Sequence, residues 1–343
     1  MKAFRPSCLC LAAWLACSVA ASPAVAQDAG SPTLAAVRAR GQLACGVDGR
    51  TAGFSLPDSR GVMRGIDADY CRALAAAVLG DAGKVRFVPL TAQARFTALQ
   101  SGEVDVLIRE TTWTLTREAN LGALFAGINF YDGTAFLVKA GGATSARELD
   151  GATVCLQSGT STELAVGDYF RTQGLKMTAV LLESLNELQQ TFLSGRCDAI
   201  ARDGSALAGF RFGLGPRAGE LALLPEVISK EPLGPMVRKG DGKWFDVVRW
   251  THFALLTGEE AGVTSVNADE MLGSTNPDIR RLLGVEGDLG KAMGLDNRWA
   301  HSAIKQVGNF GEIWERNITP LGIARGINAS WNKGGLMYAP PIR

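Results

Sequence analysis

Residues 109–120, RETTWTLTREAN, gather guanidinium, carboxylate and hydroxyl groups in one short stretch. Either arginine in it, Arg109 or Arg117, can fork two hydrogen bonds onto a carboxylate, whereas a lysine acts only as a point charge. Threonine hydroxyls can donate to the same small molecule or accept from it. A solvated surface segment has a similar composition, so the surrounding elements must decide between a binding site and a surface.

An internal repeat identifies those elements. Segments 98–110 (ALQSGEVDVLIRE) and 191–203 (TFLSGRCDAIARD) both read as a helix, a Ser-Gly stop, a short apolar strand, and then an arginine and an acid. We expect apolar strands at 43–47, 85–90 and 104–109, then at 152–157, 177–183 and 197–202, with helical periodicity between them. This alternation predicts an α/β protein with two mainly parallel sheets.

Polar residues follow several of the expected strands. Open parallel sheets bind ligands beyond the carboxyl ends of their strands. The first sheet would present Asp48 and residues 109–114 there, and the second would present residues 157–162 and 202–205. If the two sheets face each other, both sets line one cleft. The alternative is two independent domains whose strand ends are merely solvated.

The segment after residue 203 favours one cleft. It contains a Pro-rich passage, a strand, a turn at 239–242 and an apolar helix carrying residues from Trp244 to Leu255. This unit has no place in a self-contained second sheet and reads as a return to the first. The chain would then cross between the sheets near 131–133 and near 232–235. Two extended crossings make a hinge, and hinge closure over a cleft traps small molecules.

The N-terminus predicts export. Lys2 and Arg5 precede an apolar run, and residues 24–26 (AVA) fit a signal-peptidase site, so residues 1–26 read as a secretory signal. Cys17 as a lipid-anchor cysteine is the alternative. No later apolar run has the length of a membrane helix. We therefore expect an exported, soluble protein.

Composition and motifs exclude several classes. With 35 basic and 34 acidic residues, the near-neutral balance argues against nucleic acid or a membrane surface as a partner. The chain has no nucleophile elbow, zinc-protease or phosphate-loop motif, and no cysteine spacing typical of a metal site. His252 lies within the apolar helix and is interpreted as a core residue. We expect no catalytic residue, metal or cofactor.

The segments GFSLPDSRGVMRGIDADYCRALAAAVLGD, VPLTAQARFTALQSGEVDVLIRETTWTLTRE, ELDGATVCLQSGTSTELAVGDYF and EVISKEPLGPMVRKGDGKWFDVVRW carry a resemblance. They are similar to the periplasmic substrate-binding proteins of polar amino-acid ABC transporters, and specifically to the general L-amino-acid-binding proteins. The resemblance covers nearly the whole exported chain, including the tail segments NFGEIWERN and GGLMYAPPIR. It implies a two-lobe, type II clamshell with a two-strand hinge. Lobe 1 would comprise residues 27–132 and 235–343, and lobe 2 residues 133–234.

The resemblance also implies binding roles for individual residues. Arg117 matches the arginine that holds the ligand α-carboxylate, and Thr112 matches a position that contacts the carboxylate and the ammonium. Thr160 and Ser161 open a helix and can receive the same carboxylate, while Asp203 matches the acid that takes the α-ammonium. Each residue has a structural alternative. Arg117 could pair with Glu118 or Glu110 on a surface, and the others could simply cap helices.

Selectivity for the ligand side chain would rest on neighbouring positions. Asp48, Thr51 and Arg95 fall where similar proteins contact the ligand side chain, and Thr51 lacks the stacking aromatic of narrower family members. Arg95 could instead be a helix-surface residue. Glu110 stands where this subgroup more often has asparagine. Its negative charge could favour cationic ligands, although neutralisation of Arg109 or Arg95 is the preferred interpretation.

Four cysteines follow the predicted signal, which allows up to two disulfides. In the topology that the resemblance implies, Cys155 and Cys197 begin adjacent strands, which leaves Cys45 and Cys71 as the second pair. Buried unpaired thiols are the alternative.

The expected function is capture of L-amino acids with broad specificity and delivery to inner-membrane ABC permease subunits by a monomer. Two other classes compete with it. A few exported proteins of this fold are dehydratases of small carboxylic acids, and an enzyme here would need Glu110 or Asp203 as its acid or base. A sensor that reports the ligand to a membrane receptor is the third class.

Overall fold

The computed structural model describes Met1 and residues 30–343. The predicted signal segment 1–26, including Cys17, lies outside the described residues apart from Met1. Residues 31–343 form one compact unit, which contains every element discussed below. No helix among the described residues has both the length and the apolar character needed to cross a membrane.

The first sheet has five strands in the order β4-β1-β5-β14-β6. These strands are β1 (Leu43–Val47), β4 (Val85–Pro89), β5 (Val106–Leu107), β6 (Ala123–Phe125) and β14 (Met236–Arg238). Strand β1 is parallel to both β4 and β5, whereas β14 is antiparallel to β5 and β6. All five residues of β1 are buried, as expected for a central strand that is covered on both faces.

The second sheet repeats this plan in the order β10-β9-β11-β8-β12. Its strands are β8 (Thr134–Lys139), β9 (Ala152–Gln157), β10 (Met177–Leu182), β11 (Ala199–Asp203) and β12 (Leu221–Leu223). Strand β9 is parallel to β10 and β11, and β8 is antiparallel to β11 and β12. The predicted mainly parallel sheets are confirmed. Each sheet also contains antiparallel pairs, formed by β14 in the first sheet and by β8 in the second. These two strands directly follow a crossing between the sheets.

The chain crosses between the sheets twice, as predicted. Strand β7 (Phe130–Asp132) leads from β6 to β8, and β13 (Glu231–Leu233) leads towards β14. The two crossing strands pair antiparallel with each other, with Tyr131 opposite Pro232. This two-stranded ribbon is the covalent link between the sheets, so any relative motion of the sheets must bend it.

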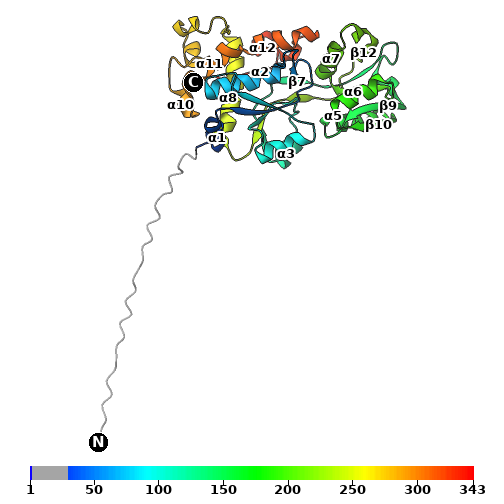
Figure 1. Ribbon diagram of the computed structural model, residues 1–343, viewed down its shortest axis with the longest axis horizontal. Helices are drawn as coiled ribbons and strands as arrows, with labels where there is room; N and C mark the ends of the chain where they lie inside the picture. The colour runs from blue at the N-terminus through cyan, green and yellow to red at the C-terminus, as the bar shows by residue number, and fades with distance from the viewer. Residues whose placement is uncertain (2–29) are drawn as a thin grey trace. The chain divides into compact units, whose positions relative to one another are not determined.

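Helices surround both sheets, and Figure 1 shows α5, α6 and α7 beside the second sheet. The helices are α1 (Pro32–Arg40), α2 (Ile66–Leu79), α3 (Ala94–Ser101), α4 (Leu115–Asn120), α5 (Ser161–Gln173), α6 (Leu185–Leu193), α7 (Gly204–Gly213), α8 (Gly242–Glu260), α9 (Pro277–Leu282), α10 (Leu289–Ala292), α11 (Trp299–Val307) and α12 (Phe310–Asn317). Short 3-10 helices are Ala146–Leu149, Gly215–Glu220, Glu270–Gly273, Thr319–Leu321, Gly326–Asn328 and Trp331–Lys333, and a small hairpin joins β2 (Leu56–Pro57) to β3 (Met63–Arg64). The helical periodicity predicted between the strands is confirmed, for example by α2 between β1 and β4 and by α6 between β10 and β11.

The C-terminal segment packs onto the first sheet and its hinge. The ring of Trp314 in α12 stacks on Phe130 of β7, with centroids 5.2 Å apart. The side-chain amide of Asn328 brackets Tyr131. Its Oδ1 accepts from the Tyr131 backbone N–H (2.7 Å), and its Nδ2 donates to the Tyr131 carbonyl oxygen (2.9 Å). The segment thus contacts one of the two strands that link the sheets.

One disulfide joins a strand to a helix, and a second joins two neighbouring strand segments. Cys45 of β1 bonds to Cys71 of α2, and Cys155 of β9 bonds to Cys197 just before β11. This is the pairing that the resemblance implied. The alternative of buried unpaired thiols is therefore not the one observed.

Candidate functional site

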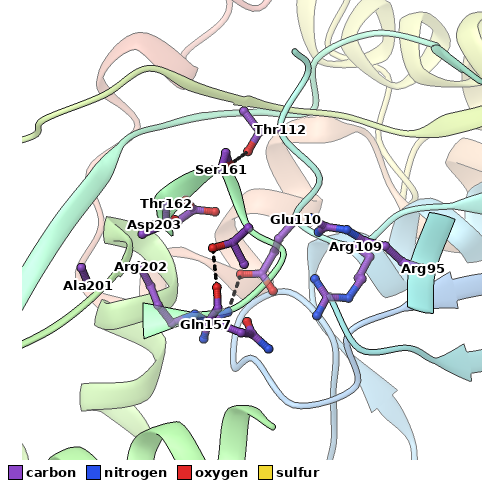
Figure 2. Close-up of a pocket in the computed structure, with 11 residues that line it drawn as sticks. Arg95, Arg109, Glu110, Thr112, Gln157, Ser161, Thr162, Ala201, Arg202 and Asp203 are labelled. Atoms are coloured by element: carbon purple, nitrogen blue, oxygen red, sulfur yellow. Dashed lines mark hydrogen bonds and ion pairs between the residues drawn. The ribbon is translucent and has the colours of Figure 1, made fainter. Parts of the chain in front are cut away.

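A cavity lies where the carboxyl ends of the two sheets meet, and Figure 2 shows its lining from both sides. From the first sheet and its helices it is lined by Arg95, Arg109, Glu110 and Thr112, and from the second by Gln157, Thr160, Ser161, Thr162, Ala201, Arg202 and Asp203. Its volume is about 20 Å³, room for about one water molecule. An amino acid could enter only if the two sides moved apart.

The N-terminus of α5 forms one wall of the cavity. Thr160 is the N-cap residue, and its hydroxyl accepts from the Glu163 N–H (3.2 Å) and donates to the Gln157 carbonyl oxygen (2.7 Å). The helix begins at Ser161. First-turn N–H groups lack helical partners and carry the positive end of the helix dipole. This wall is therefore suited to an anion such as a carboxylate.

Thr112 meets this helix from the opposite side of the cavity. Its hydroxyl oxygen lies 3.0 Å from that of Ser161, and the Ser161 hydroxyl also donates to Glu231 (2.8 Å). Because Ser161 has a single hydroxyl proton, Thr112 must donate in the bond between them. Thr112 thus joins the first sheet to the second through a directed hydrogen bond.

Arg117 is buried beside the cavity but does not line it. Its Nη1 donates to the Thr112 carbonyl oxygen at 2.8 Å, and its guanidinium lies over the Phe96 ring, 5.4 Å from the centroid. Burial lowers the pKa of Arg117, and Glu231 and Asp203 oppose that shift. Glu118 instead accepts from the Trp113 indole N–H (2.6 Å). Arg117 is therefore not a surface arginine paired with Glu118.

Asp203 ends β11 and occupies the N-cap position of α7, yet its carboxylate makes no capping hydrogen bond within the described chain. Capping α7, the structural alternative for this residue, is therefore not what Asp203 does. Burial raises its pKa well above the usual range, and the nearby carboxylates of Asp132, Glu231 and Glu110 raise it further. A cationic group in the cavity would relieve that repulsion.

Asp48 and Thr51 lie behind the cavity wall. Asp48 accepts from Arg109 Nη2 at 2.8 Å and from the Thr51 hydroxyl at 2.7 Å. Neither residue lines the cavity, although Asp48 lines a neighbouring one of about 220 Å³ that shares Arg109 and Gln157 with it. Asp48 and Thr51 could therefore contact a ligand directly only if the cavity widened. Otherwise they would influence the ligand through Arg109.

Arg95 is only 2% exposed, so the alternative of a helix-surface arginine is wrong. Its guanidinium lies over the Phe96 ring, 4.7 Å from the centroid. Burial lowers its pKa, and the nearby positive charges of Arg117 and Arg109 act in the same direction. Its Nε has no hydrogen-bond partner among the described residues.

Glu110 does not neutralise Arg109 in the way we expected, because Arg109 forms its ion pair with Asp48. The carboxylate of Glu110 lies 3.9 Å from Arg202 Nη2, across the cavity. Figure 2 shows these two side chains pointing toward each other. Burial raises the pKa of Glu110 to about 7, whereas the positive charge of Arg202 opposes that shift.

Several lining residues were not nominated from the sequence. Strand-end positions were predicted for Arg109, Gln157, Thr162 and Arg202, but ligand contacts were not. The available signal was an arginine in an otherwise apolar strand, since Arg202 follows Ala199, Ile200 and Ala201. A buried arginine needs partners, so this position could have been recognised.

Outside the cavity, Trp113 and His252 have structural roles, and the core position of His252 is the one that was expected. Trp113 stacks on Phe125, with centroids 5.4 Å apart. His252 is buried, and its Nδ1 lies 2.9 Å from the Tyr70 hydroxyl. In the part of the chain that the structure describes, no group of three His, Cys, Asp or Glu side chains is arranged to hold a metal ion.

Comparison with known proteins defines the class. Residues 43–259 match the bacterial extracellular solute-binding proteins, family 3, and the chain belongs to this family. It is 52% identical over 331 residues to the glutamate/glutamine/aspartate/asparagine-binding protein BztA of Rhodobacter capsulatus, covering 95% of this chain and 98% of that protein. It is 51% identical to the general L-amino acid-binding periplasmic protein AapJ of Rhizobium johnstonii, covering 93% and 95%.

A solved structure agrees. A periplasmic binding protein of an ABC transporter from Brucella ovis with glutathione bound is 53% identical, with a TM-score of 0.88, and covers 91% of this chain and 99% of that chain. The predicted family and clamshell fold class are confirmed. The similar proteins are binding proteins, which supports a binding protein over a dehydratase-like enzyme. Family membership also supports an extracytoplasmic location.

Proposed function

We propose that this protein captures L-amino acids in the cavity between its two sheets and delivers them to the inner-membrane permease subunits of an ABC transporter. The observation that carries the proposal is the presence of opposite chemistries in one cavity. The α5 N-terminus suits an anion, and the Asp203 carboxylate suits a cation. A zwitterion presents both groups on one carbon atom.

Individual roles follow from this arrangement. The α-carboxylate would lie between the first turn of α5 and Arg117, whose guanidinium would turn from the Thr112 carbonyl when the cavity widens. The α-ammonium would bind Asp203. Arg95, Glu110, Asp48 and Thr51 remain on the side where a ligand side chain would project. The names of the similar proteins, which include acids, amides and L-amino acids in general, support this ligand class.

The same proposal covers the rest of the chain. Residues 1–26 would be a signal peptide that directs the protein to the periplasm. Lobe 1 would consist of residues 27–132 and 235–343, and lobe 2 of residues 133–234, moving about the β7–β13 ribbon. The protein would act as a monomer, and its closed form would be the one that the permease recognises.

The test is a calorimetric titration of the exported protein, freed of endogenous ligand, against L- and D-amino acids. We expect dissociation constants of about 1 µM or less for several L-amino acids, which corresponds to about 8 kcal/mol. Glutathione belongs in the panel, because its γ-glutamyl end carries a free α-amino and α-carboxyl group. Absence of binding by every amino acid would overturn the proposal.

A further inference from the structure

Glu110 is a buried carboxylate without a hydrogen-bond partner. Its side chain is 3% exposed, and neither carboxylate oxygen has a partner in the described part of the chain. Arg202 Nη1, on the other side of the cavity, also lacks one. Buried polar atoms are nearly always hydrogen-bonded. The two side chains therefore leave acceptors and a donor facing the same space.

The backbone holds Glu110 in this position. At φ 40°, it is the non-glycine residue with positive φ within residues 30–343, a conformation that is unfavourable for glutamate. Its N–H donates to the buried Asp67 carboxyl group at 3.0 Å, which fixes that conformation. Backbone strain of this kind persists where surrounding structure enforces it, often at binding sites.

Neither nearby arginine forms a close ion pair with Glu110. Arg109 pairs with Asp48 at 2.8 Å. Arg202 Nη2, at 3.9 Å, is beyond ordinary hydrogen-bond distance from Glu110. The nearby Thr51 hydroxyl favours the ionised form of Glu110, but it donates to Asp48 at 2.7 Å. Glu110 is thus not a counter-ion in a tight pair, and its carboxylate oxygens have no hydrogen-bond partner among the described residues.

We propose that Glu110 and Arg202 together select the side chain of the bound amino acid and favour a primary amide, as in L-glutamine, over a carboxylate. The inference rests on the proposed function and specifies its ligand class. A primary amide carries a donor NH₂ and an acceptor C=O on one group. Glu110 accepts from the NH₂ while Arg202 donates to the C=O. A carboxylate satisfies Arg202 but sets its other oxygen against Glu110.

Protonation of Glu110 weakens this preference. The charged groups that face it are Arg202 and Arg109, which favour its ionised form, and Asp48, Asp67 and Asp203, which oppose it. Burial dominates and raises its pKa to about 7. A protonated Glu110 donates an O–H and can bond to a carboxylate ligand. The preference for glutamine over glutamate therefore grows as the pH rises through neutrality.

The test compares wild type and Glu110→Gln by calorimetry with L-glutamine, L-glutamate and L-alanine, near pH 6 and near pH 8.5. In wild type we expect about a tenfold or larger preference for glutamine at the higher pH, narrowing at the lower. Glu110→Gln removes most of that preference and its pH dependence. The affinities for L-glutamine and L-glutamate are each compared with that for L-alanine, so that a general change in affinity cancels. Glu183→Gln is the matched control, because it removes an exposed carboxylate from the neighbouring cavity.

The outcomes separate the two proposals. If no amino acid binds wild type, the proposed function fails and this assignment fails with it. If amino acids bind but the glutamine-to-glutamate ratio is the same in wild type and Glu110→Gln, only this assignment is overturned. An equal shift in Glu183→Gln would overturn it also, because long-range charge would explain the effect. The pH profile of wild type needs no variant, and Glu110→Asn, a residue type tolerant of positive φ, provides a second variant.

Discussion

The hydroxyl groups of Thr112 and Ser161 lie 3.0 Å apart and join opposite sides of the cavity. Thr112 follows a strand of the first sheet, and Ser161 opens the helix beside the second. Since Ser161 donates to Glu231, the Thr112 proton is the one that links the two sides. This bond exists only while the sheets are in contact, so it stabilises the closed arrangement.

Thr112→Val keeps the shape of the side chain and removes that proton. The closed form should lose about 1 kcal/mol, so the affinity for every amino acid should fall by about fivefold. Ser158→Ala removes another hydrogen bond between the two sides, to Gln93, which is exposed. We expect a smaller effect there. Calorimetry of both variants measures the difference, and equal losses would contradict a special role for Thr112.

Arg117→Ala should weaken binding of all L-amino acids by about 3 kcal/mol, because the α-carboxylate they share would then be buried without its guanidinium partner. The matched control is Arg50→Ala, which removes an exposed guanidinium at the neighbouring cavity and should change affinity little. Melting temperatures show whether each variant is folded. A loss confined to some side-chain classes would assign Arg117 to side-chain recognition instead.

The strands buried on both faces were the most predictable part of the fold. The predicted bounds of 43–47 and 152–157 agree with β1 and β9, because mainly apolar runs there fill sheet centres. The strand expected at 104–109 is reduced to Val106–Leu107, since β14 meets it only at Leu107 and the chain turns away at Glu110. A pairing partner such as β14, which lies about 130 residues later in the chain, leaves no signal in the local sequence.

The site was predictable as a set of strand ends but not as a network. Sequence spacing placed Arg109, Glu110 and Asp48 near one another. It could not decide which carboxylate pairs with Arg109, because that depends on distances in the folded protein that sequence spacing does not determine. The same limit applies to Arg202, whose contact with Glu110 spans both sheets.

Asn328 offers a test of the C-terminal segment, which lies beyond the region matched by the family. Asn328→Ala removes both hydrogen bonds to Tyr131 in the hinge strand. We expect a loss of about 1 to 2 kcal/mol in the free energy of unfolding. The affinities for all ligands should change by the same factor, because the residue acts on closure rather than on ligand contacts.

The control for Asn328 is Asn297→Ala, which removes an exposed hydrogen bond to Asp288 and should change stability by less than about 0.5 kcal/mol. Urea unfolding and calorimetry provide the measurements. A reordering of ligand preference in Asn328→Ala would show that the tail influences the cavity itself.

Asp67 should make stability depend on pH. It is buried beneath Glu110, and burial, together with the Glu110 charge, raises its pKa to about 8. In the unfolded chain its pKa is close to the ordinary aspartate value of about 3.9. Between these values the folded state holds the proton and the unfolded state does not. The contribution of protonated Asp67 to the free energy of unfolding is therefore fully present below the unfolded-state pKa. It is lost, by up to about 1.4 kcal/mol per pH unit, as the pH rises toward the folded-state pKa.

Asp67→Asn removes this titration while retaining an acceptor for the Glu110 N–H. The slope of the unfolding free energy against pH should therefore become less negative between pH 5 and pH 8. The change should correspond to about one fewer proton released on unfolding. Urea unfolding at several pH values measures the slope, with Asp168→Asn, at an exposed ion pair, as the control. An unchanged slope in Asp67→Asn would mean that Asp67 is already ionised in the folded protein, and that Glu110 then faces a buried negative charge.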